Sequence, residues 1–129
     1  MIHKSMESDF HKKLKAKIHD FILLVYGLTE KFPKSELFGT VSQLRRAAVS
    51  IMLNYVEGFA RLRPKVKLQF WETSFGSSKE CQYLIFLAME KKWISKTDYD
   101  KAFKLVDESS GMLWKTIQGL SNIINKDNL

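Results

Sequence analysis

Apolar residues recur along most of this chain at alternating steps of three and four positions. That period is typical of helices that pack against neighbours along one side. Four segments carry the pattern, and they predict helices at residues about 10–31, 36–60, 64–91 and 96–124. No stretch shows the two-residue alternation of a strand, and no internal repeat is visible. The sequence therefore predicts an all-α fold.

Each predicted helix has one apolar seam. The first two seams consist of Leu14, Ile18, Phe21, Val25, Leu28 and Phe32, and of Val41, Leu44, Ala48, Ile51, Tyr55, Gly58 and Leu62. The other two consist of Leu68, Trp71, Phe75, Ile85 and Met89, and of Tyr99, Phe103, Val106, Ser110, Leu113, Ile117, Leu120 and Ile124. We expect four aromatic residues to be part of the core rather than platforms on which bases stack: Trp71, Phe75, Phe103 and Trp114.

Proline and serine residues mark where the predicted helices begin and end. Pro33 closes the first helix, and Ser35 is a candidate N-cap for the second, because its hydroxyl can accept from an early backbone N–H. Pro64 suits the first turn of the third helix, where its missing N–H costs nothing. Ser95 and Asp98 resemble a capping box at the start of the fourth helix.

Helices of this length joined by short connections favour an antiparallel, up-down-up-down four-helix bundle. The third helix has an unusual interior, since Gly76, Ser77 and Ser78 are poor helix formers. Two explanations stay open for these small residues. They allow a neighbouring helix or chain to approach closely, or they mark a kink.

The composition fits a single globular domain of 129 residues with a formal net charge of +7 and a pI near 9.5. A basic protein of this kind favours an anionic partner, above all nucleic acid and less readily an acidic membrane surface. A basic surface that serves solubility alone is the plain alternative.

The sequence also bears on cellular location. Its single cysteine, Cys81, excludes an internal disulfide framework and fits a reducing cytosol. Residues 1 to about 9 predict a mobile start without the apolar core of a signal peptide. The longest apolar run, residues 21–26, is far shorter than the roughly 20 residues of a membrane span. We therefore expect a soluble cytoplasmic protein that does not enter a membrane.

In the predicted bundle, the N-terminus, the connection between the second and third helices and the C-terminus share one end. Basic residues gather there with little acidic compensation. The candidate phosphate-binding residues at this end are Lys12, Lys13, Arg61, Arg63, Lys65 and Lys67. Arg45 and Arg46, early in the second helix, are secondary candidates. Either of them could face nucleic acid or pair with carboxylates of another helix.

Catalytic and metal-binding motifs are missing from the sequence. The three histidines, His3, His11 and His19, lack the carboxylate register of a di-iron bundle, and no phosphate-cradling loop or nucleophile motif occurs. Cys81 has the surroundings of a buried, inert thiol. We expect no enzyme, no cofactor and no metal.

Two central glutamates carry the one enzymatic alternative. Glu57 and Glu80 lie on the second and third predicted helices, where a pair of carboxylates could in principle do acid–base work. Glu57 also lies four residues before Arg61, the favourable order for an ion pair within a helix, and we favour that structural role.

Several motifs together resemble a known family. They are Phe32-Pro33, the run Gln43 to Arg61 (QLRRAAVSIMLNYVEGFAR) and the segment from Phe70 to Glu80. In these motifs the chain resembles the small four-helix-bundle proteins encoded in intervening sequences of bacterial large-subunit rRNA genes. The accessory proteins of diversity-generating retroelements form a related branch. The resemblance covers about residues 10 to 120.

This resemblance implies a non-enzymatic homopentamer, a barrel of five bundles with a basic surface. In the retroelement branch it implies binding to nucleic acid and to a reverse transcriptase. Our first hypothesis is a homo-oligomer that binds RNA or DNA by charge and shape. The alternative is a protein-interaction scaffold, or an accessory subunit, that docks a reverse transcriptase or another nucleic-acid enzyme.

Overall fold

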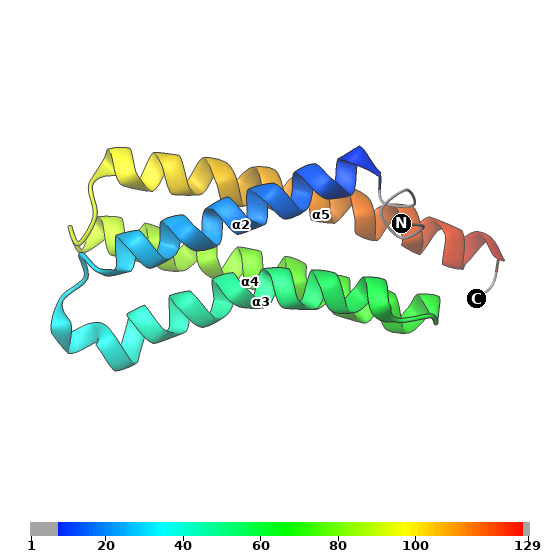
Figure 1. Ribbon diagram of the computed structural model, residues 1–129, viewed down its shortest axis with the longest axis horizontal. Helices are drawn as coiled ribbons and strands as arrows, with labels where there is room; N and C mark the ends of the chain where they lie inside the picture. The colour runs from blue at the N-terminus through cyan, green and yellow to red at the C-terminus, as the bar shows by residue number, and fades with distance from the viewer. Residues whose placement is uncertain (1–7, 128–129) are drawn as a thin grey trace.

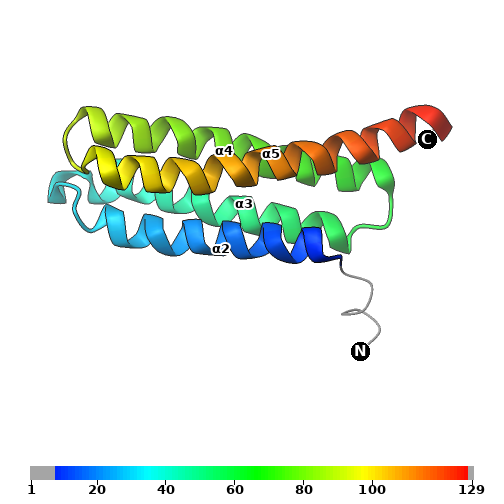
Figure 2. The ribbon, with the colours of Figure 1, turned by 90° about the horizontal axis from the view of Figure 1, so that it is seen from above.

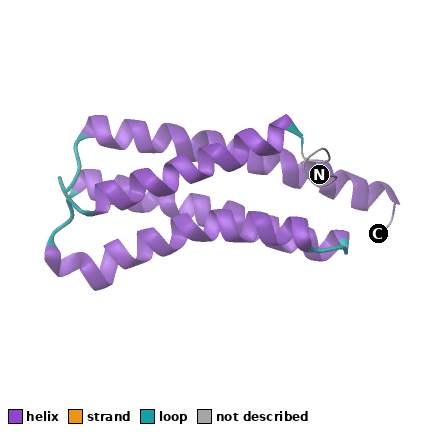
Figure 3. Cartoon of the chain, in the orientation of Figure 1, coloured by secondary structure: helices purple, strands orange, loops and turns teal. Residues whose placement is uncertain are grey.

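The computed structural model describes residues 8–127, and almost all of them are helical. The chain forms α2 (Asp9–Thr29), two short segments η1 (Lys34–Glu36) and η2 (Leu37–Val41), then α3 (Ser42–Ala60), α4 (Pro64–Glu90) and α5 (Lys96–Asp127). No strand occurs in residues 8–127 (Figure 3). The predicted all-α class with four long helices is confirmed. Seven residues of the predicted mobile start, residues 1–7, lie outside the described range.

The four long helices lie side by side as an elongated bundle (Figures 1 and 2). α2 packs on α3 and α5, and α4 packs on the same two helices, so α2 and α4 occupy opposite corners. The connection between α3 and α4 lies at the same end as the start of α2 and the end of α5 (Figure 1). The connections from α2 to α3 and from α4 to α5 lie at the other end.

Local sequence explains where three of the helices begin. The Ser8 hydroxyl accepts a hydrogen bond from the backbone N–H of His11 and caps α2. Pro64 occupies the first turn of α4, as predicted. The Ser95 hydroxyl accepts from the N–H of Asp98 at 3.0 Å at the start of α5, which confirms the predicted cap there.

The predicted start of the second helix, with Ser35 as its N-cap, is wrong. A 3₁₀ turn and a π-type turn precede α3, and Gly39 inside the π-type turn has φ −110° and ψ −110°. Glu36 caps the π-type turn η2, because its carboxylate accepts hydrogen bonds from the backbone N–H and the hydroxyl of Thr40. These hydrogen bonds lower the pKa of Glu36. Regular α-helix therefore begins only at Ser42.

Small residues bring α4 close to both of its neighbours. Ser74 donates to the carbonyl of Ile51 in α3 at 2.6 Å, and Ser77 shares a hydrogen bond with Ser50. Ser78 donates to a hydroxyl of α5 at 3.2 Å. Because α4 continues unbroken through this patch, close helix packing rather than a kink explains its small residues.

The core matches the predicted seams at most positions. All six residues of the first seam are buried, as are six of the seven in the second. Leu62 is the exception, because it lies in the connection after α3 and is 95% exposed. Trp114 was predicted in the core and is 47% exposed, whereas Trp71 is buried and Phe75 and Phe103 are half-buried.

None of the described helices is both long and apolar enough to cross a membrane.

Candidate nucleic-acid interface

The basic connection between α3 and α4 is a tight hairpin held by two core contacts. Arg61 and Arg63 have extended backbone on either side of Leu62, and Pro64 then starts α4. Below the turn, the indole N–H of Trp71 donates to the carbonyl of Tyr55 at 3.1 Å. Gly58 leaves the space that this indole occupies, since a methyl group there would overlap it. The hairpin is therefore a rigid platform.

Aromatic contacts attach the start of α2 to this platform. The imidazole of His11 and the hydroxyl of Tyr55 share a hydrogen bond. The ring of Phe59 lies edge-on to both of these rings, with centroids 4.8 Å and 5.1 Å away. Lys12 and Lys13 follow His11 directly and therefore lie next to the hairpin.

Two of the six predicted cations at this end form contacts with other residues of the chain. Arg61 forms an ion pair with Glu57, as predicted, and its guanidinium lies 4.9 Å from the ring centroid of Phe70. Lys67 donates to the carbonyls of Gly58 and Phe59, at 2.9 Å and 3.4 Å. Its burial lowers the pKa of the ammonium group. Lys67 thus caps the C-terminal end of α3 and is a poor candidate for phosphate contact.

The other four cations point to solvent. Lys12, Lys13, Arg63 and Lys65 are exposed. None of their side chains forms a hydrogen bond or an ion pair with another residue in the described range. We call these four residues the basic end.

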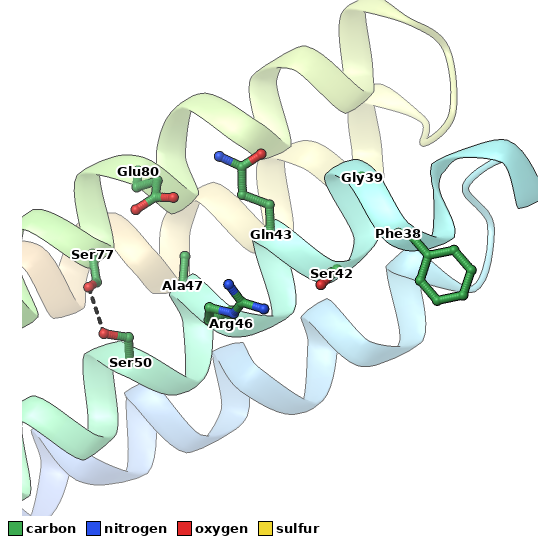
Figure 4. A pocket seen from close by; sticks show the side chains of 9 residues that line it. All are labelled: Phe38, Gly39, Ser42, Gln43, Arg46, Ala47, Ser50, Ser77 and Glu80. Atoms are coloured by element: carbon green, nitrogen blue, oxygen red, sulfur yellow. Dashed lines mark hydrogen bonds between the residues drawn. The ribbon is translucent and has the colours of Figure 1, made fainter.

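The two secondary candidates, Arg45 and Arg46, have different surroundings in the structure. Arg45 is held against α2: its Nε donates to the Thr29 hydroxyl at 2.8 Å, and its guanidinium lies 4.7 Å from the ring centroid of Tyr26. Arg46 is exposed and far from the basic end. It lines a groove of about 530 Å³ between α3 and α4 together with Gln43 and Glu80 (Figure 4). The structure therefore does not bring Arg45 and Arg46 together with the other six.

Sequence reasoning missed Lys115. This residue is exposed on α5 and lines a shallow pocket of about 300 Å³ beside Phe10, His11 and Trp71. It therefore lies next to the basic end. Counting helical turns back from Lys126 along α5 would have placed Lys115 in the same half of the bundle.

The side chains that could act in catalysis or bind a metal are buried, paired or too far apart. Burial raises the pKa of the Cys81 thiol to about 12, with a smaller contribution from neighbouring Glu80. That thiol stays protonated and unreactive near neutral pH. Glu57 is paired with Arg61. Among residues 8–127, no three histidine, cysteine or acidic side chains lie close enough to hold a metal ion.

Comparisons with known proteins agree with this architecture. A crystal structure of a protein of unknown function from the S23 ribosomal protein family of Bacteroides thetaiotaomicron superimposes with a TM-score of 0.75 at 18% sequence identity. The match covers 81% of this chain and 97% of that one, which shows a shared fold. No curated protein matches. A family model described as 23S rRNA-intervening sequence protein matches residues 11–115, and the chain belongs to this family.

Proposed function

We propose that this protein is a non-enzymatic, homo-oligomeric nucleic-acid-binding protein that contacts phosphates through its basic end. The observation that supports the proposal best is a set of four exposed cations that have no partner among residues 8–127: Lys12, Lys13, Arg63 and Lys65. Flexible lysine and arginine side chains on a fixed scaffold can follow a phosphate backbone without reading bases. Binding to RNA or DNA then depends on charge and shape, with little sequence specificity.

The assembly is part of the proposal. Family resemblance supports an antiparallel, up-down-up-down bundle that forms a pentameric barrel. Repeating the basic end in each copy would give one assembly several phosphate-binding surfaces. Linked surfaces raise the overall affinity without any new contact in a single copy.

A salt series tests the phosphate contacts. Purified protein is titrated against a structured RNA and against duplex DNA at several salt concentrations, and its mass in solution is recorded alongside. Affinity should fall linearly on a log–log plot, with a slope of about −0.9 per phosphate contact on duplex DNA. Changing Lys12, Lys13, Arg63 and Lys65 together to Gln should weaken binding and flatten that slope.

A matched control separates the basic end from net charge. Four exposed lysines in the other half of the bundle, Lys34, Lys91, Lys101 and Lys104, are changed to Gln to give the same loss of charge. This control should bind nearly as well as the wild type. Equal loss in both quadruple variants would assign binding to net charge alone, and unchanged binding in the first variant would remove the basic end as the site.

The second candidate function is an accessory subunit that docks a reverse transcriptase or another nucleic-acid enzyme. An exposed apolar pair at the opposite end of the bundle favours it, since Leu37 is 49% and Phe38 is 93% exposed. Such residues serve as anchors in protein interfaces. Assembled protein that binds neither RNA nor DNA at low salt would favour this candidate, as would a gene located in a retroelement cassette rather than an rRNA gene.

A further inference from the structure

A shallow pocket lies beside the basic end, where α5 extends beyond the start of α2 (Figures 1 and 2). Its volume is about 300 Å³, at the lower end of the range for small-ligand sites. Its walls come from three helices and are mostly apolar or aromatic: Phe10 and His11 of α2, Trp71 of α4, and Gly119, Leu120 and Ile123 of α5. We call this site the α2–α5 pocket.

The aromatic wall of the α2–α5 pocket is held in place by the core. The rings of Phe10 and His11 stand edge to face with centroids 5.4 Å apart. His11 shares its hydrogen bond with the hydroxyl of Tyr55, which is fully buried. Phe10 and His11 are both half-buried, so part of each ring still faces solvent. A wall that is fixed before a ligand arrives loses less entropy on binding.

The α5 side of the pocket combines apolar surface with open space. Ile123 is 53% exposed although it is a large apolar residue in a pocket wall. Gly119 is exposed, and a methyl group added to it would have no atom within 4 Å. An apolar ligand could therefore cover Ile123 and occupy the space beside Gly119 without moving the helix.

Cations stand on both sides of the opening. Lys115 of α5 is exposed on the rim, and its side chain has no hydrogen-bond or ion-pair partner among the described residues. On the α2 side, Lys12 of the basic end directly follows His11. Asp9, next to Phe10, is the acidic residue in the first turn of α2 and offsets part of this charge. The rim thus attracts an anion while the interior favours an apolar group.

A nucleotide of a single strand combines these two properties. Its base is flat and aromatic, and its phosphates are negative. In a duplex the bases are paired and stacked, so a base can enter a pocket only after unstacking, which costs free energy. Proteins that bind single strands commonly combine a positive groove with aromatic side chains on which bases stack.

We propose that the α2–α5 pocket holds one unstacked base of a single-stranded nucleic acid, while Lys12 and Lys115 contact the adjoining phosphates. This inference rests on the proposed function and names single strands as its preferred substrate class. Phe10 and His11 provide the stacking surface. Trp71 remains a core residue, because it is only 6% exposed and adds little surface to the pocket.

The pocket wall also predicts little preference among the bases. Thr116 is the hydroxyl-bearing residue of the wall, and its hydroxyl donates to the carbonyl of Met112 at 2.9 Å. That donor is therefore occupied and does not read the edge of a base. Stacking on a ring face tolerates every base, since each base has an aromatic face.

A comparison of two strands tests whether a base enters the protein. Oligothymidylate is compared with an abasic DNA strand of the same length, which has the same phosphates and no bases. Fluorescence anisotropy at one salt concentration gives both affinities. The wild type should bind oligothymidylate about tenfold more tightly, because stacking of one base on an aromatic side chain contributes on that order.

A substitution that fills the pocket assigns this preference to the site. Gly119→Leu places a side chain in the open space and should abolish the preference for oligothymidylate, while affinity for the abasic strand stays the same. Gly111→Leu is the matched control, because Gly111 is also exposed on α5 with no atom within 4 Å of an added methyl group. This control lies outside the pocket and should keep the preference. Far-UV circular dichroism and thermal unfolding check that both variants are folded.

Lys115→Gln separates phosphate contact from base contact. The variant should bind both strands more weakly by the same factor and should keep the preference for oligothymidylate. Its log–log salt slope on single strands should be smaller by about 0.7, the value for one phosphate contact. An unchanged slope would remove Lys115 from the phosphate contacts of the proposal.

The outcomes separate this inference from the proposed function. Equal binding of oligothymidylate and the abasic strand by the wild type would overturn the base pocket and leave the salt test of the basic end unaffected. A preference that survives Gly119→Leu would overturn it as well. Salt-independent binding that still requires bases would instead contradict the basic end. If Gly119→Leu abolishes binding to vesicles of anionic lipid and changes neither strand affinity, the pocket holds an acyl chain and the inference is wrong.

Discussion

The two ends of the bundle both carry lysine and arginine but use them differently. At the end where α2 leads into α3 and α4 into α5, Lys31 pairs with Asp98 at 2.8 Å and Lys96 pairs with Asp100 at 2.9 Å. At the basic end, none of the four cations has a hydrogen-bond or ion-pair partner among the described residues. The sequence already places the larger excess of positive charge at the basic end. The structure adds that two of the cations at the opposite end are paired with aspartates.

The same contrast exists within the hairpin itself. Lys65 and Lys67 are two residues apart on the first turn of α4, so they point to nearly opposite sides of the helix. Lys65 is exposed, whereas Lys67 reaches back to the carbonyls of α3. A basic cluster can therefore combine a structural cation and a free one at neighbouring positions. Substitutions should separate the two roles.

The largest effect is expected from Gly58→Ala, which should break the platform of the basic end. The added methyl group overlaps the indole of Trp71 and disturbs its hydrogen bond to Tyr55, which costs about 2 kcal/mol in the free energy of unfolding. Denaturant titration measures this loss. Gly76→Ala is the control, because space around Gly76 is open and alanine favours the helix by about 0.5–1 kcal/mol. A tolerated Gly58→Ala would show that the indole can move aside.

Lys67→Gln and Lys65→Gln should separate stability from binding. Lys67→Gln removes the two hydrogen bonds to α3 and should lower the free energy of unfolding by about 1 kcal/mol. Lys65→Gln should change stability by less than about 0.5 kcal/mol and should weaken RNA binding more. Chemical denaturation and an RNA titration on both proteins check this. Equal effects of the two substitutions in both assays would contradict the division of roles.

A double-mutant cycle on Glu57 and Arg61 should give a smaller value. The pair is exposed and lies within one helix, so the coupling energy should be about 0.3–0.5 kcal/mol and should decrease with salt. Glu57→Gln, Arg61→Gln and the double variant are compared by thermal unfolding. A coupling energy near zero would add Arg61 to the cations available for phosphate.

The smallest effect concerns pH at the opposite end. The hydrogen bond from Lys31, with help from Ser95, lowers the pKa of Asp98 below its usual value. A lowered carboxyl pKa stabilises the fold above the unfolded-state value of about 3.9, and this contribution disappears as pH falls through the folded-state pKa. Asp98→Asn should cost under about 0.5 kcal/mol at pH 6 and nothing near pH 2. Thermal unfolding across that range measures it.

Periodicity could predict the helices because the rule that produces it is local. Residues such as Leu14, Ile51 and Val106 are buried wherever a seam faces a neighbour, and steps of three and four residues place them there. The prolines and Ser95 act within one helical turn, so their roles could be predicted as well. The start of α3 could not be predicted, because Glu36 rather than Ser35 caps the turn η2 and Gly39 gives that turn an irregular backbone.

The candidate site was predictable only as a region. Topology places the basic residues at one end, but the partners of Arg45 and Lys67 lie on other helices or across the hairpin. No pattern in one sequence gives the direction of those side chains. Trp114 fails for the same reason: its position suits a seam, while the packing of α4 on α5 leaves almost half of its surface open.

The order of the helices also has a consequence for how fast the chain folds. Three of the four long-helix pairs that pack together are consecutive in sequence, and only α2 and α5 join distant parts of the chain. Helical bundles dominated by such local contacts typically fold in microseconds to milliseconds. Each hairpin can form while its helices are still close along the chain, and the meeting of α2 with α5 is the long-range event that closes the bundle.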